Sequence, residues 1–256
     1  MFTESLSPED AVALLKDGVR RSTSRKLRSA PSRSTLLDGA SKGQWPYAAV
    51  LACIDSRSPV EQIFDASVGD LFVSRVAGNT ATPDLIASLE YATKYAGSKA
   101  ILVLGHTKCG AVKGAWTGLK DGHLTDLLAR IQPAVDVTKA MAGDGATEAN
   151  LDACAVANVR ETIKKLRRVS HIIADLEGEK KITVIGALYD VTTGEVNFLE
   201  DPPARPSMLT ASPISTRATT LAMMGHGEAT LSLGNNGAKA LAVIDHGEET
   251  LSLEEI

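Results

Sequence analysis

The feature that most constrains the fold is a set of short apolar runs that alternate with helix-like segments. Residues 47–53 (YAAVLAC), 100–106 (AILVLGH) and 181–190 (KITVIGALYD) are continuous apolar runs, typical of strands that are buried on both faces. A further strand is expected at 70–76 (DLFVSRV). Because helical patterns separate these runs, we expect an α/β protein with a mainly parallel sheet and helices on both faces.

The expected helices carry recognisable end signals. The first begins after Ser7 as N-cap, with Pro8 at its first position, and Gly18 is expected to end it. Thr82 is the expected cap of a later helix. That helix is expected to begin at Pro83 and to end before Gly97, and further helices are expected at 125–135 and 150–176. After them, Thr193 and Gly194 predict a turn that leads into a last strand.

A breaker-rich segment at 200–208 (EDPPARPSM) marks a boundary. It divides the chain into a domain at 1–203, with an N-terminal helical arm at 1–43, and a C-terminal extension at 204–256. The extension contains a short repeat, HGEATLSL and HGEETLSL, and an Asn-Gly turn signal, which together predict a β-rich segment. His226 and His246 open the two copies, and we interpret them as a structural duplication rather than a metal pair.

Composition argues against several classes of protein. The net charge of -4 gives no general attraction to nucleic acid or to an anionic membrane, and no apolar run approaches the roughly 20 residues of a membrane span. Three cysteines are typical of thiols kept reduced, so we expect a cytoplasmic protein. The basic segment 20–35 is interpreted as a solvated arm, with an organelle transit segment as the alternative.

Three metal-ligand side chains follow buried strands. Cys53 ends one strand, His106 ends another, and Cys109 comes three residues later, so all three are expected at the carboxyl edge of the sheet. Two thiolates and one imidazole suit zinc, and three protein ligands leave a position open, as in catalytic sites. A structural zinc site and simple burial of the cysteines remain alternatives. A phosphate loop is excluded, since Ala111 and Val112 stand where Lys and Ser or Thr are needed.

These motifs resemble those of the β-class carbonic anhydrases. The likeness rests on CIDSR at 53–57 and GHTKCG at 105–110, supported by GDLFVSRVAGN, SLEYA and VIGALYD, and it extends over about residues 44–200. It implies one Zn²⁺ per subunit on Cys53, His106 and Cys109, with Asp55 and Arg57 as a catalytic dyad beside the metal. The implied reaction is reversible hydration of carbon dioxide to bicarbonate and a proton by zinc hydroxide. The implied assembly is a homodimer or higher homo-oligomer with active sites at the subunit interface.

The resemblance also implies a substrate pocket. Gln44, Phe72 and Tyr91 match residues that line it, and the backbone N–H of Gly110 matches one that contacts bicarbonate. Phe72 and Ala77 are apolar, which suits carbon dioxide because that molecule carries no charge.

Asp55 has two roles open to it. It can accept a hydrogen bond from the zinc-bound water, held by a paired contact with Arg57, or it can become a fourth zinc ligand and close the site. In the family the closed state belongs largely to a branch with Trp three residues before the first zinc Cys, and here that residue is Val50. We therefore expect an open site.

Two other functions remain open at this point. One is hydrolysis of carbonyl sulfide or carbon disulfide on the same scaffold, and the other is a zinc-bound regulatory or scaffolding role without turnover. Cys154 is interpreted as a core residue, His123 as a solvated loop residue with proton relay as the alternative, and His171 as a mid-helix surface or packing residue. The arm after Gly18 and the extension depart from the family pattern.

Overall fold

A computed structural model describes residues 5–29, 31–200, 230–232 and 239–241. The chain forms two compact units, Met1–Ala204 and Arg205–Ile256. Within the described ranges, no helix combines the length and the apolar character needed to cross a membrane.

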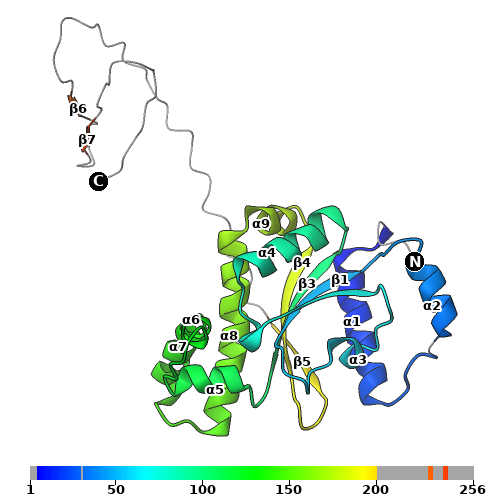
Figure 1. Cartoon of the computed structure of the whole chain (residues 1–256), viewed down its shortest axis with the longest axis horizontal. Helices are drawn as coiled ribbons and strands as arrows, with labels where there is room; N and C mark the ends of the chain where they lie inside the picture. Colours follow the sequence, from blue (N-terminus) through cyan, green and yellow to red (C-terminus); the bar gives the residue numbers. More distant parts are fainter. Residues whose placement is uncertain (1–4, 30, 201–229, 233–238, 242–256) are drawn as a thin grey trace, which may run out of the picture. The chain divides into compact units, whose positions relative to one another are not determined.

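The first unit is built on a five-stranded sheet with the order β2-β1-β3-β4-β5 (Figure 1). Its strands are β1 (Ala48–Ala52), β2 (Leu71–Arg75), β3 (Ala100–His106), β4 (Thr183–Tyr189) and β5 (Val196–Leu199). The pairs among β2, β1, β3 and β4 are parallel, and β5 runs antiparallel to β4. This confirms the mainly parallel sheet, and it leaves β2 at one edge.

Helices cover both faces of this sheet. The helices of the first unit, with its 3₁₀ turn η2 and π turn η3, are α1 (Pro8–Thr23), α2 (Arg33–Ala40), α3 (Val60–Ile63), η2 (Ala77–Asn79), α4 (Pro83–Glu90), η3 (Tyr91–Tyr95), α5 (Gly110–Trp116), α6 (Leu124–Ala129), α7 (Gln132–Ala142), α8 (Glu148–Val169) and α9 (His171–Gly178). Helices α1 and α3 pack on one face, and α4, α8 and α9 pack on the other (Figure 1).

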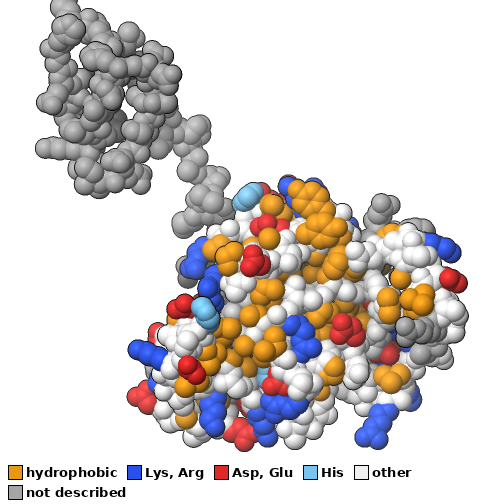
Figure 2. Space-filling view, in the orientation of Figure 1, with side chains coloured by type: hydrophobic (Ala, Val, Ile, Leu, Met, Phe, Trp, Pro, Cys, Tyr) orange, Lys and Arg blue, Asp and Glu red, His pale blue; other side chains and the backbone are white. Residues whose placement is uncertain are grey.

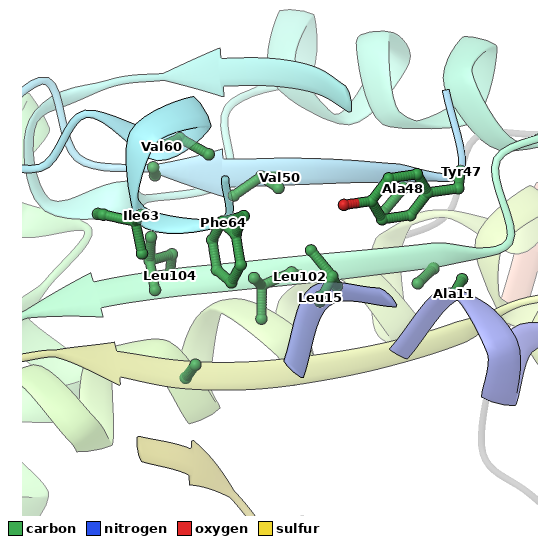
Figure 3. Close-up of a cluster of buried hydrophobic side chains, with 13 residues drawn as sticks. Ala11, Leu15, Tyr47, Ala48, Val50, Val60, Ile63, Phe64, Leu102 and Leu104 are labelled. Atoms are coloured by element: carbon green, nitrogen blue, oxygen red, sulfur yellow. The ribbon is translucent and has the colours of Figure 1, made fainter. Parts of the chain in front are cut away.

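The central strands are buried on both sides because their residues alternate between two cores. In β1, Ala48, Val50 and Ala52 face the core under α1 and α3, where Phe64 of α3's C-terminus is also fully buried (Figure 3). Leu51 faces the opposite core, with side chains of α8. The period-two alternation of a pleated strand therefore explains why continuous apolar runs were needed here.

Helix α1 starts as predicted and ends later than predicted. Ser7 and Asp10 form a reciprocal capping box, and Pro8 is the first helical residue. Gly18 does not end the helix, which continues to Thr23. A Cβ at Gly18 would lie 1.9 Å from the carbonyl oxygen of Phe64, so the glycine permits close helix packing rather than a stop.

The basic segment 20–35 is not merely solvated, which corrects the expectation from its composition. The Arg21 Nε donates to Asp65 at 2.5 Å, and the Arg28 guanidinium donates to Asp70 at 2.8 Å. Ser32 then caps α2. The arm is therefore tied to the first unit by ion pairs that its charge density alone does not reveal.

Two predicted helices are each divided into two. The segment 125–135 contains all but the first residue of α6 and the start of α7, which has a proline in its first turn. The segment 150–176 is interrupted at Ser170, whose hydroxyl donates to Glu90 at 2.6 Å and accepts from the Ile173 N–H as the cap of α9. His171 is therefore the exposed first residue of α9 and not a mid-helix residue.

The second unit contains an antiparallel pair of strands, β6 (Thr230–Ser232) and β7 (Lys239–Leu241). The predicted Asn236–Gly237 turn and the repeated His226 and His246 lie outside the described residues.

Candidate metal centre

The three predicted ligands come together at the carboxyl edge of the sheet. Cys53 directly follows β1, His106 is the last residue of β3, and Cys109 is the N-cap of α5. One sulfur or nitrogen atom of each lies within 4.8 Å of those of the other two, and all three residues are buried. Parallel neighbouring strands place their ends side by side, so this cluster is a direct consequence of the sheet order.

The histidine is prepared to act as a ligand. Its Nδ1 lies 2.8 Å from the carbonyl oxygen of Thr107, which fixes the proton on Nδ1 and leaves the lone pair of Nε2 free on the side of the two thiols. His106 is 1% exposed, and its Nε2 finds no hydrogen-bond partner among the described residues. A buried nitrogen without a partner is costly, so its position beside two thiols fits a zinc ligand.

The two sulfurs share negative charge. The hydrogen bond from Cys109, the neighbouring His106 ring, and the Gly78 and Asp55 N–H groups together outweigh burial and hold the pKa of Cys53 well below its usual range. The pKa of Cys109 is raised because its proton is held against the Cys53 sulfur. Zinc replaces such a shared proton, since coordinated thiols are deprotonated. The donor set therefore fits the ion.

Asp55 and Arg57 form the predicted dyad. The Arg57 Nε and Nη2 donate to the two carboxylate oxygens of Asp55 at 2.9 and 2.8 Å, and the Arg57 N–H donates to the first oxygen at 2.9 Å. These hydrogen bonds, the guanidinium contacts above all, hold the pKa of Asp55 far below its usual range despite partial burial. Asp55 Oδ2 lies 3.8 Å from His106 Nε2. An ionised carboxylate therefore stands next to the metal position.

Two further charged residues hold the loops of the site. Arg75, the last residue of β2, donates from Nε to the Cys53 carbonyl at 2.9 Å and from Nη2 to the Asp55 carbonyl at 2.6 Å. Asp152 of α8 accepts from the Lys108 N–H at 2.9 Å, and the Lys108 carbonyl accepts from Arg57 at 3.2 Å. The loop between His106 and Cys109 is thus linked both to α8 and to the dyad.

A family comparison decides the identity of this site. The sequence model of a family described as carbonic anhydrase matches residues 48–196, which include the three ligands and the dyad. The chain belongs to the β-carbonic anhydrase family. It is therefore a carbonate dehydratase, and zinc is its cofactor.

Named relatives agree with this assignment. The chain is 30% identical to carbonic anhydrase 2 of Mycobacterium tuberculosis over 193 residues, which cover 73% of this chain and 91% of the relative. It superposes on the β-carbonic anhydrase CafA of Aspergillus fumigatus with a TM-score of 0.62 and 26% identity, over 76% of this chain and 92% of that one. A chain of one of two tetrameric β-carbonic anhydrases of Sordaria macrospora is also similar, with a TM-score of 0.60 and 26% identity, over 67% of this chain and 89% of that one.

The residues predicted to line the pocket of this carbonic anhydrase are divided between two places. Ala77, in η2, precedes the glycine that contacts Cys53, and Gly110 directly follows Cys109. Gln44 precedes β1 and borders a hollow of about 590 Å³, whereas Cys53 follows the other end of that strand. The five residues of β1 span about 16 Å, so Gln44 does not lie at the cluster of its own chain.

Phe72 and Tyr91 also lie apart from the zinc ligands of their own chain. Phe72 pairs in register with Ala49, near the start of β1, and its ring meets that of Tyr91 edge-on at 6.3 Å. Both residues border a hollow of about 460 Å³ beside the edge strand β2. Their part in a substrate pocket stays a prediction.

Other candidates from the sequence lie away from the ligands. Cys154 is fully buried in the core formed with α5 and α7, and burial raises its pKa to about 11, which confirms its interpretation as a core residue. His123 is exposed at the start of α6, and its relay role stays untested. Sequence reasoning missed Arg75 and Asp152. The signals that could have found them are a cation at the end of a strand and an acid just inside a helix that faces the site.

Proposed function

We propose that this carbonic anhydrase hydrates carbon dioxide reversibly at an open site on Cys53, His106 and Cys109. The proposal rests on the Nε2 of His106, which has no hydrogen-bond partner in the part of the chain that the structure describes. This nitrogen faces two thiols and lies 3.8 Å from the Asp55 carboxylate, which is hydrogen-bonded to Arg57. When bound, zinc lowers the pKa of a coordinated water to about 7 and supplies a nucleophile near neutral pH.

The protein residues orient and hold protons around that reaction. Asp55 stays ionised because both of its oxygens accept from Arg57, and its remaining lone pairs can accept a hydrogen bond from water at the reacting position. Arg57 is itself held by the Lys108 carbonyl, so the dyad has a fixed direction. This arrangement supports an open site, in which Asp55 accepts a hydrogen bond from the water and leaves the fourth position of the metal free.

The named relatives are carbonic anhydrases. They give no support to hydrolysis of carbonyl sulfide or carbon disulfide, nor to a zinc-binding role without turnover. Carbon dioxide and bicarbonate are therefore the substrate pair that we propose.

We further propose that the active enzyme is a homo-oligomer, of which a dimer is the basic unit. The edge strand β2 and the adjacent Tyr91 and Tyr95 support this, since the two tyrosines are 55% and 71% exposed. Figure 2 shows hydrophobic side chains gathered across the middle of this face and near α4. Gln44, Phe72 and Tyr91 would then line the pocket of a second subunit. We also propose a cytoplasmic location, on the basis of the reduced cysteines.

Stopped-flow hydration of carbon dioxide by zinc-loaded protein tests the proposal. We expect catalysis by the wild type and by Cys154→Ala, a control at a buried cysteine outside the site. Cys53→Ser is expected to lose zinc and activity together, and Asp55→Asn to keep zinc and lose activity. A wild type with stoichiometric zinc and no hydration, which releases hydrogen sulfide from carbonyl sulfide instead, would refute the proposed reaction.

A further inference from the structure

The turn η2 supplies a backbone donor to the metal centre. The Gly78 N–H donates to the Cys53 Sγ at 3.3 Å, inside the protein. An N–H group that donates to a thiolate draws charge away from the sulfur, and such contacts tune metals that are bound through sulfur. The orientation of this single peptide group therefore affects a zinc ligand directly.

Gly78 cannot hold that orientation through its own side chain. Its φ of 68° lies in the left-handed region, and a Cβ there would meet the Ile131 Cδ1 at 2.6 Å, so glycine is required. Glycine, however, adopts many backbone conformations with little difference in energy. The turn's own hydrogen bond, from the Asn79 N–H to the Val76 carbonyl at 3.0 Å, restricts this freedom in part, and contacts from outside the turn add to it.

One such contact comes from α8, and it falls on the peptide group that follows the one carrying the Gly78 N–H. The Asn158 Nδ2 donates to the Gly78 carbonyl at 2.7 Å, and Asn158 is only 1% exposed. Asparagine is a poor residue for a helix interior, and a buried amide is costly unless it is hydrogen-bonded. A second residue of α8, Thr162, donates to the next carbonyl of the turn, that of Asn79, at 3.3 Å.

We propose that Asn158 is a positioning residue of the zinc site, which holds Gly78 so that its N–H donates to the Cys53 thiolate. It acts through Gly78 and contacts neither metal nor substrate. The inference rests on the zinc site and not on the hydration reaction, so its test measures metal binding and the sulfur–metal bond. Failure of the test would leave the proposed function intact.

The direction of the effect follows from the hydrogen bond. Without it the Cys53 sulfur keeps more charge, so an electron moves from sulfur to the metal at lower energy. In cobalt(II)-substituted protein, the sulfur-to-cobalt charge-transfer band should therefore move to longer wavelength. Because the ligand is also less firmly oriented, zinc affinity should fall by about 10- to 100-fold.

The experiment compares Asn158→Leu and Asn158→Ser with Thr162→Val in the full chain. Leucine keeps most of the volume of asparagine without its donor, and serine shortens the reach to Gly78. Thr162→Val removes a hydrogen bond from the same helix to the same turn and leaves Asn158 and Gly78 paired, so it is the matched control. Cobalt spectra and zinc competition with a chelator are recorded for each folded protein.

We expect both Asn158 variants to show the red-shifted band and weakened zinc binding, and Thr162→Val to match the wild type within about twofold. Wild-type spectra and affinity in either folded Asn158 variant would overturn the proposal. An equal effect of Thr162→Val would overturn it too, because any loosening of the turn would then suffice. If neither Asn158 variant folds while Thr162→Val does, the role of Asn158 is packing and the proposal is wrong.

Discussion

Two strand glycines set how closely α8 approaches the sheet, and adding a methyl group to one of them should destabilise the fold. A Cβ at Gly186 in β4 would lie 2.7 Å from the Val159 Cγ1, and one at Gly105 in β3 would lie 2.6 Å from the Val159 Cγ2. Val159 is fully buried. Gly186→Ala therefore forces a methyl group into a contact closer than the ordinary 3.4–4 Å.

The expected magnitude follows from that overlap. Overpacking of a filled core costs about 1–3 kcal/mol, and loss of glycine's freedom in the unfolded chain offsets about 0.4–1 kcal/mol of this. The net destabilisation by Gly186→Ala should therefore be about 1–2 kcal/mol. For a unit of this size, that change lowers Tm by about 2–8 °C.

Denaturant unfolding of the zinc-loaded protein at fixed concentration measures this cost, and a double mutant tests its cause. Val159→Ala alone removes buried methyl groups and should cost about 1–3 kcal/mol. It also removes the atoms that the new methyl at Gly186 would strike. The destabilisation of the double mutant should therefore be smaller than the sum of the two single destabilisations by about 1 kcal/mol or more. A double mutant whose destabilisation equals the sum of the two single values within about 0.5 kcal/mol would show that Val159 is not the obstacle.

Three further predictions concern the metal centre and the arm. Cys53→Ser should reduce bound zinc, measured by elemental analysis, to well below one ion per chain, while Cys154→Ala keeps it. Asp152→Ala removes the acceptor of the Lys108 N–H and should lower kcat/KM for hydration by about 10- to 100-fold with the zinc content preserved; an unchanged rate would show that the loop is held without it. Asp65 has a lowered pKa because Arg21 and Arg28 outweigh its desolvation, so its stabilising effect is present above a pH of about 4 and is lost as pH falls below it. The stability difference between wild type and Asp65→Asn should therefore be constant from pH 8 to 5 and shrink toward pH 3 in denaturant titrations.

The sheet and the ligands could be predicted from sequence because their signals are local. A strand buried on both faces must be apolar throughout, and ligands that directly follow such strands meet at one edge. The end of a helix is harder to predict when a glycine has more than one use. Gly18 resembles a helix stop, yet it lies inside α1. A glycine stands there because Phe64, which is distant in sequence, packs too closely for a side chain.

The supporting contacts of the site could not be predicted in the same way. Asn158 lies 80 residues from Gly78, and Asp152 lies 44 residues from Lys108, so nothing in either local pattern reports the pairing. Gln44 shows the opposite case. Its motif position matches the substrate pocket, but the length of β1 places it far from Cys53 in the same chain. The second subunit that we propose would bring it to a site.

Zinc X-ray absorption at pH 7 shows whether Cys53, His106 and Cys109 hold the ion in an open site. We predict two sulfur atoms at about 2.3 Å, one imidazole nitrogen at about 2.0–2.1 Å, and a further light atom that Asp55→Asn does not remove. One sulfur or none in the shell would contradict the ligand set. A carboxylate ligand that disappears in Asp55→Asn would contradict the open site.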